Sequence, residues 1–400
     1  MPLGGSPPGS GSPPVGLLAV AALLAVAALV AGCASFPDAG QRDWREKPEL
    51  DVAAEPQPQV PGDPSRGRQP GQQPGQQPSG PPAQPQGCLD PDPQVIATCL
   101  DSVTAIAVLP GGAAALVAER STGRLLRVEQ GVEPEEIARL PVDPLAADGG
   151  VTGLTLSPSY HEDELIYAYV TTATDNRVMR IAPGDAPKAV LTGIPRGQTG
   201  NGGALAADAR GALLVATGDG GAPAAAADPA SLAGKVLRID AFGAAAKDNP
   251  DPSTRVISGG LHNPGGLCVD PTDGTTWVTD RAGQRDALYR LQPGKPLATP
   301  AWTWPDRPAV AGCAAMPGLV AVSLTIGTSI FVLRPGPDGV FTGKPETTLK
   351  NAYGRLHAAA IGPDGLLWLG TVNKAGGAPV SSDDRVIRIQ PPAAGGGGVD

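Results

Sequence analysis

From about Cys88 to Pro392 the chain alternates short apolar stretches with turns rich in proline, aspartate and glycine. Six segments share one pattern: an apolar strand, a polar turn, a second apolar strand, and a strand that reads apolar-apolar-Arg-apolar. The strands of this last kind are LLRVEQ (Leu125–Gln130), VMRIAP (Val178–Pro183), VLRIDA (Val236–Ala241), LYRLQP (Leu288–Pro293), IFVLRP (Ile330–Pro335) and VIRIQP (Val386–Pro391). Five of the six place the arginine at the same step.

The repeat predicts an all-β fold, a six-bladed β-propeller over residues 88–392, followed by a flexible tail at 393–400. Segments that recur every ~40–60 residues with several short strands each are typical of propellers. One unit cannot bury both of its faces, whereas a ring of units does so. Glycine and proline interrupt every window long enough for a helix. A β-sandwich is the alternative fold, but it leaves the sixfold repeat unexplained.

The N-terminal region has a different pattern. Val15–Ala31 is one unbroken apolar run, short for a membrane-spanning helix of about 20 residues and suited to a signal-peptide core. It ends in LVAGC, a lipobox, so residues 1–32 are interpreted as a lipoprotein signal peptide and Cys33 as the lipidated residue. The alternative is a buried or spanning helix with a chance cysteine. No Lys or Arg precedes the run, which leaves the true start codon open.

Residues 33–87 are predicted to be a disordered linker, because their Pro/Gln/Gly-rich sequence cannot bury a core. Extended at roughly 3 Å per residue, such a stalk reaches on the order of 100 Å or more. It would carry a propeller into or through a cell wall, although a passive spacer explains the composition equally well. The interpretation places the protein outside the cytoplasm, anchored to the cell membrane by lipid on Cys33.

Charge and cysteine content narrow the function classes. The formal net charge is −9 and there are no basic blocks, which argues against nucleic-acid partners. Besides Cys33, four cysteines remain, an even number that fits two disulfides in an exported chain. Cys88–Cys99 would close a short loop and Cys268–Cys313 would join distant segments, while the other pairings stay open. A metal site is the competing interpretation, but no CxxC pair is present.

Four stretches carry a resemblance to a known family. GNGGALAADARGALLVATGDGG (Gly200–Gly221), followed by DPASLAGKVLRID, GLHNPGGL and WTWP, resembles the soluble quinoprotein glucose/sorbosone dehydrogenase family. The lipobox, the stalk, the cysteines and the segments at 174–197 and 302–316 are also similar to a divergent actinobacterial lipoprotein of that family. The resemblance implies a six-bladed propeller that oxidises sugars with pyrroloquinoline quinone and calcium.

Position by position, the resemblance also implies that much of this chemistry is lost. The histidine that acts as the family's base corresponds to Gly200, which has no side chain for general base catalysis. His262 and His357 each occupy a position where the family has a cofactor-binding arginine, and Thr325 occupies the position of a cofactor-binding lysine. Asn263 and Arg355 remain as cofactor-binding candidates.

Several weaker candidates complete the site. Asp286 and Asp280 are the calcium candidates, and acids such as Asp219 and Asp280 at strand ends more often hold turn amides than perform chemistry. His262 and His357 could form a new acid/base or metal pair, or simply fill the mouth of the channel. The third histidine, His161, lies in a polar turn and is expected to be solvated.

The predicted function is therefore an envelope lipoprotein whose propeller is non-catalytic and binds a sugar, another envelope ligand or a protein partner. The alternative is an aldose dehydrogenase that uses pyrroloquinoline quinone and calcium.

Overall fold

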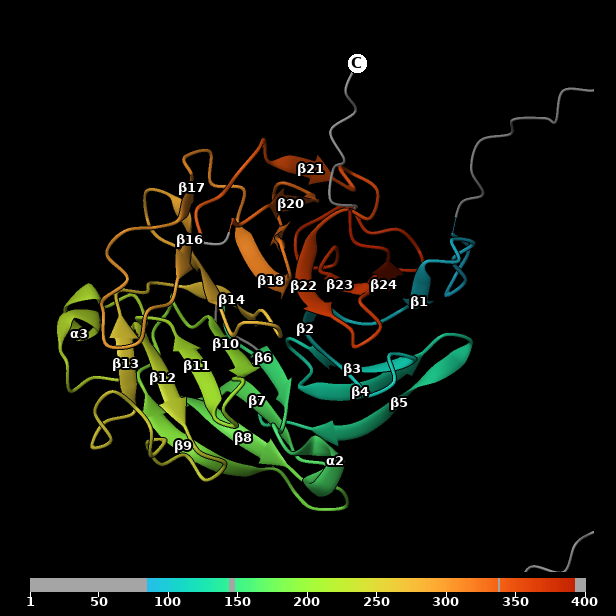
Figure 1. Ribbon diagram of the computed structural model, residues 1–400. Helices are drawn as coiled ribbons and strands as arrows, with labels where there is room; N and C mark the ends of the chain where they lie inside the picture. The colour runs from blue at the N-terminus through green and yellow to red at the C-terminus, as the bar shows by residue number, and fades with distance from the viewer. Residues whose placement is uncertain (1–84, 144–147, 337–338, 393–400) are drawn as a thin grey trace, which may run out of the picture. The chain divides into compact units, whose positions relative to one another are not determined.

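A computed structural model describes residues 85–143, 148–336 and 339–392. In this part of the chain, six four-stranded antiparallel sheets follow one another around a ring (Figure 1). The predicted signal peptide, Cys33, the linker up to residue 84 and the tail lie outside the described residues. Among the helices that are described, none is long and apolar enough to cross a membrane.

Each of the first five sheets, or blades, is formed by four consecutive strands, ordered from the axis outward. They are β2 (Val103–Val108), β3 (Ala114–Glu119), β4 (Arg124–Glu129), β5 (Val132–Arg139); β6 (Val151–Leu156), β7 (Ile166–Thr171), β8 (Asn176–Ile181), β9 (Lys188–Ile194); β10 (Gly203–Ala207), β11 (Leu213–Thr217), β12 (Lys235–Ile239), β13 (Val256–Gly259); β14 (Pro264–Val269), β15 (Thr276–Arg281), β16 (Asp286–Arg290), β17 (Trp302–Trp304); and β18 (Val310–Met316), β19 (Leu319–Leu324), β20 (Ser329–Leu333), β21 (Glu346–Thr348). Two short helices, α2 (Tyr160–Asp163) and α3 (Pro223–Ala227), lie in the connections.

The sixth blade closes the ring with a strand from the other end of the chain. It contains β22 (Leu356–Ile361), β23 (Leu367–Thr371) and β24 (Val386–Ile389), and its outermost strand is β1 (Val95–Ala97). Val95 pairs with Ile387, and Ala97 pairs with Val386. The sequence pattern alone does not indicate whether the N-terminal or the C-terminal end of the chain supplies the strand that closes the ring.

The repeat correctly predicted six blades but not their strand number. The arginine-containing strands are the third strand of each blade, and a fourth strand lies outside them. Three of the outer strands, β5, β9 and β21, are mainly exposed, and β5 buries none of its side chains fully. Because such strands lack an apolar face, they do not stand out in the sequence.

The hydrophobic core consists of layers between neighbouring blades. Six clusters of buried side chains fill the six junctions in turn, so every blade is covered on both faces. The innermost strands approach each other so closely that small residues are required. A Cβ on Gly312 of β18 would lie 2.6 Å from the carbonyl oxygen of His357 on β22.

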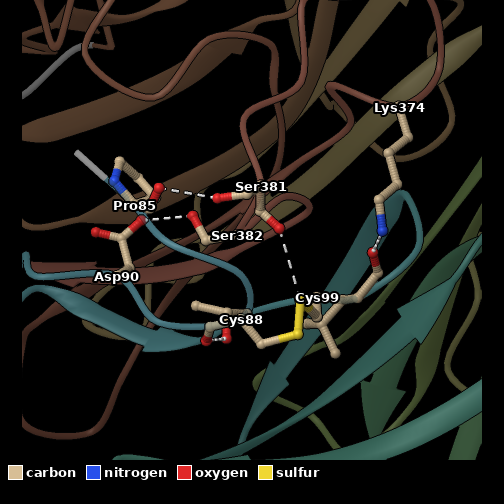
Figure 2. The surroundings of a disulfide bond; sticks show 9 residues. Pro85, Cys88, Asp90, Cys99, Lys374, Ser381 and Ser382 are labelled. Carbon is tan, nitrogen blue, oxygen red and sulfur yellow. Dashed lines mark hydrogen bonds between the residues drawn. A yellow bond between two sulfur atoms is a disulfide. The ribbon is translucent and has the colours of Figure 1, made fainter.

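Both predicted disulfides are confirmed, Cys88–Cys99 and Cys268–Cys313. The second joins the innermost strands β14 and β18 of adjacent blades. The first closes a covalent loop that contains β1. Figure 2 shows how the sixth blade holds this loop: the hydroxyl of Ser381 donates to the carbonyl of Pro85, and the hydroxyl of Ser382 donates to Asp90.

Candidate functional site

A cavity of about 140 Å³ lies on the axis of the ring, at the end where the second strand of each blade finishes. Three arginines from three blades line it: Arg120 follows β3, Arg281 ends β15, and Arg355 precedes β22. His357 of β22 and Asp148, which precedes β6, also line it. We call this cavity the arginine pocket.

Two of these three arginines were missed in the sequence analysis, which had found only Arg355 and inferred that the family's cations are largely lost. Arg120 and Arg281 each follow an acid, in Glu119-Arg120 and Asp280-Arg281, at the end of a second strand. The repeated acid-arginine pair was the available signal. Aligning the ends of the second strands, rather than the third strands, would have found it.

The positive charge of the pocket exceeds its negative charge. Asp148 is the one carboxylate among the described residues that line it, against three guanidinium groups. Burial lowers the pKa of Arg120, and the charge of Arg281 adds to that effect while Asp148 opposes it. Within the described chain, Nε of Arg281 and Nε of Arg355 are buried without a hydrogen-bond partner. Such a site favours an anion, because carboxylates and phosphates form charge-assisted bonds with guanidinium groups.

His357 is neutral. Burial lowers its pKa to about 3, and the nearby charges of Arg281 and Arg120 contribute to the same shift. Its Nδ1 lies 3.2 Å from the carbonyl oxygen of Thr104. A carbonyl only accepts, so Nδ1 carries the hydrogen and Nε2 keeps its lone pair.

His262 has different surroundings from His357, and the two imidazoles do not form a hydrogen-bonded pair in the described structure. Nδ1 of His262 lies 3.2 Å from Oδ2 of the fully buried Asp280. This hydrogen bond raises the pKa of His262. The negative charges of Asp280 and Asp219 also raise this pKa, whereas burial of the imidazole lowers it. The imidazole is 45% exposed.

Gly200, which the resemblance places at the family's base, is enclosed by a neighbouring turn. Its φ is +70°, a backbone conformation that favours glycine. A Cβ there would lie 2.7 Å from both Oδ1 of Asp219 and the backbone nitrogen of Gly221. The local backbone is thus built for a residue without a side chain.

Asn263 and Asp148 connect this turn to the pocket. Oδ1 of Asn263 accepts a 2.9 Å bond from the backbone nitrogen of Gly202, and its Nδ2 donates to Asp148. Asn263 therefore supports the pocket wall, whereas Arg355 and Thr325, the other two positions singled out beside it, line the pocket directly.

The two calcium candidates hold the backbone. Asp280 accepts hydrogen bonds from the backbone nitrogens of His262 and Asn263, and Asp286 accepts one from Val310. Asp219 similarly accepts from Gly221. Over the described residues, no group of three or more His, Cys, Asp or Glu side chains is arranged to hold a metal ion. These carboxylates shape the turns, as expected for acids at strand ends.

A wider cavity of about 690 Å³ occupies the rest of the axis and is lined by all six innermost strands. It shares the lining residues Thr104, Thr152 and Gly265 with the arginine pocket, so the two cavities adjoin on the axis. Half of the residues that line it are alanine or glycine.

Comparison with known proteins gives consistent results. The family model described as Glucose / Sorbosone dehydrogenase matches residues 100–315. The PQQ-bound aldose sugar dehydrogenase of Streptomyces coelicolor is 31% identical, with a TM-score of 0.69 over 74% of this chain and 96% of that one. A Thermus thermophilus protein described as an oxidoreductase (glucose dehydrogenase) is 30% identical, with a TM-score of 0.68 over 74% and 98%.

A curated relative, the aldose sugar dehydrogenase YliI of Escherichia coli (strain K12), is 26% identical over 231 residues. The match covers 53% of this chain and 62% of that protein, less than two thirds of its length.

Proposed function

The chain belongs to the glucose/sorbosone dehydrogenase family, and we propose that it is a divergent member whose arginine pocket binds a small anion and does not oxidise sugar. The surplus of guanidinium groups over carboxylates in the pocket supports anion binding. The loss of catalysis is inferred from position 200. A missing general base alone costs about 10²–10⁴ in rate, and here the backbone leaves no room to restore one.

The same proposal places the protein in the cell envelope. The lipobox that ends at Cys33 and the Pro/Gln/Gly-rich stalk support lipid anchoring to the membrane. An anchored propeller on a long tether is suited to capturing a ligand or contacting a partner away from the bilayer. Propellers often serve as binding platforms, and the fold alone assigns no chemistry.

Sugar oxidation with pyrroloquinoline quinone is the second candidate, and it is favoured by the PQQ-bound relative from Streptomyces coelicolor. The arginines are suited to the carboxylates of this cofactor. The size of the pocket is not: its volume of about 140 Å³ is close to that of an engineered cavity of about 150 Å³ that holds benzene. A quinone with three fused rings and three carboxylates is larger than this volume and would have to extend beyond the pocket. This difference in size supports the proposal of a smaller anion.

One titration separates the two candidates. Purified full-length protein is titrated with pyrroloquinoline quinone at millimolar calcium, and aldoses and a redox dye are then added. The proposal predicts no dye reduction above that of a heat-denatured sample. A tight complex that reduces the dye with an aldose would establish the dehydrogenase instead.

A further inference from the structure

The arginine pocket contains acceptors as well as donors, and this combination narrows the class of ligand. Three guanidinium groups can only donate hydrogen bonds, so they favour the oxygens of an anion. With Asp148 opposing one of them and His357 neutral, the pocket has a surplus of two positive charges. A neutral sugar would leave this charge uncompensated.

His357 adds a requirement for a donor on the ligand. Because its Nδ1–H is directed at the carbonyl of Thr104, its Nε2 can only accept a hydrogen bond. A carboxylate or sulfate oxygen has no hydrogen to give it. The hydroxyl of Thr152, buried in the wall of the same pocket, also has no partner within the described structure, and a ligand hydroxyl would satisfy it.

The volume sets an upper limit on what is enclosed. At about 140 Å³, close to the cavity that holds benzene, the pocket encloses about six or seven non-hydrogen atoms, or one end of a longer chain whose remainder lies at the mouth. A carboxylate with a hydroxyl on the neighbouring carbon places acceptor and donor oxygens close together. That arrangement matches arginines and a neutral imidazole on one small wall.

We propose that the arginine pocket recognises a hydroxycarboxylate, either a short one such as glycerate or the carboxylate end of a sugar acid. The inference rests on the proposed anion-binding function and adds the ligand class to it. Arg355 and its two partner arginines bind the carboxylate, and Nε2 of His357 accepts a hydrogen bond from the adjacent hydroxyl. His357 is thus the residue that distinguishes a hydroxylated acid from a plain one.

The test uses three matched probes on purified full-length protein: glycerate, propionate, which has the carboxylate without hydroxyls, and glycerol, which has hydroxyls without the carboxylate. Binding is measured by calorimetry and by the NMR signal of His357. We expect glycerate to bind at least about 10-fold more tightly than propionate, because a lost hydrogen bond in a closed site leaves its partner unpaired. Glycerol should not bind measurably.

Variants assign the effect to residues. Arg355→Gln should weaken glycerate and propionate alike, on the order of 10- to 100-fold. His357→Phe should weaken glycerate while leaving propionate unchanged, and Thr152→Val should act in the same direction if the phenylalanine variant does not fold. Arg210→Gln, at an exposed arginine outside the pocket, is the control and should change nothing.

The outcomes separate the two levels of the proposal. If propionate binds as tightly as glycerate, or His357→Phe affects both equally, the hydroxycarboxylate inference is wrong although anion binding stands. If neither acid binds and neither shifts the His357 signal, both the ligand class and the anion-binding function are wrong.

Discussion

Oδ1 of Asp219 lies 2.7 Å from the point that a Cβ on Gly200 would occupy. The carboxylate is fixed there by a 2.7 Å hydrogen bond from the backbone nitrogen of Gly221. The position that the resemblance assigns to the family's base is therefore closed by a turn of the same blade, and a histidine there would have to displace this turn.

The first prediction concerns this closure. Gly200→Ala and Gly200→His should both destabilise the protein. A residue other than glycine in a left-handed backbone conformation costs about 1–2 kcal/mol of stability, and the turn at Asp219 must also move to make room for the new side chain. Gly211→Ala is the matched control, with a φ of +82° and open space around its Cβ position. Thermal unfolding should show a clearly larger loss at position 200. Equal losses at the two positions would contradict the closure.

The second prediction follows from the neutral His357. Its folded pKa of about 3 lies below the ordinary value of 6.5, so the unfolded chain takes up a proton below pH 6.5 that the folded chain does not. This difference removes at most about 2 kcal/mol of stability between pH 7 and pH 5. His357→Gln should reduce the acid-induced loss by that amount in urea unfolding at the two pH values. An unchanged pH dependence would show that His357 is protonated in the folded protein.

The third prediction concerns His262 and Asp280. The hydrogen bond that Nδ1 of His262 donates to Asp280 raises the pKa of His262, so this pair adds stability that is fully present below the unfolded pKa and is lost as the pH rises through the folded pKa. In Asp280→Asn the pKa should fall toward the ordinary value. NMR titration measures this directly because the chain has three histidines. Asp219→Asn should lower the pKa of His262 by less than Asp280→Asn does. A larger decrease in Asp219→Asn would show that Asp219, and not Asp280, is the main cause of the raised pKa.

The fourth prediction concerns the loop that closes the ring. Removing Cys88–Cys99 by a double serine substitution should cost about 3 kcal/mol, the loop-entropy value for a sequence separation of 11. Hydrogen exchange should rise first in β1 and in its partner β24, because β1 lies within the covalent loop that the disulfide closes. The matched variant lacks Cys268–Cys313, and its faster exchange should instead appear in β14 and β18. The same exchange pattern in both variants would rule out a local role for each bond.

The fifth prediction concerns anchoring. Cys33→Ala should release the protein from the membrane fraction, because lipidation requires that cysteine. Protein that still fractionates with membranes after the substitution would contradict the lipobox interpretation.

The sequence predicted the blade number, the fold class and both disulfides because these depend on repeated apolar strands and paired cysteines. It did not reveal the fourth strands, whose exposed side chains give no period, as in β5. It also could not show that β1 closes the ring, since a three-residue strand carries no signal of its partner.

The site was predicted less completely than the fold, and for a physical reason. Arg120, Arg281 and Arg355 are far apart in sequence and meet only because three blades converge on the axis. Similarly, the partner of His262 became visible only when the start of β14 and the end of β15 were placed side by side. The sequence showed which cationic residues are replaced at single motif positions. It did not show that arginines from other blades supply positive charge to the same pocket.

The central claim is that the arginine pocket binds a small anion in a propeller that no longer oxidises sugar. Calorimetric titration of the full-length protein and of Arg355→Gln with glycerate, paired with the dye assay in pyrroloquinoline quinone, calcium and glucose, tests it most directly. The account predicts saturable binding to the unsubstituted protein, binding weakened by about 10- to 100-fold in the variant, and no dye reduction. Sugar-dependent dye reduction by the unsubstituted protein, or glycerate binding that Arg355→Gln leaves unchanged, would contradict it.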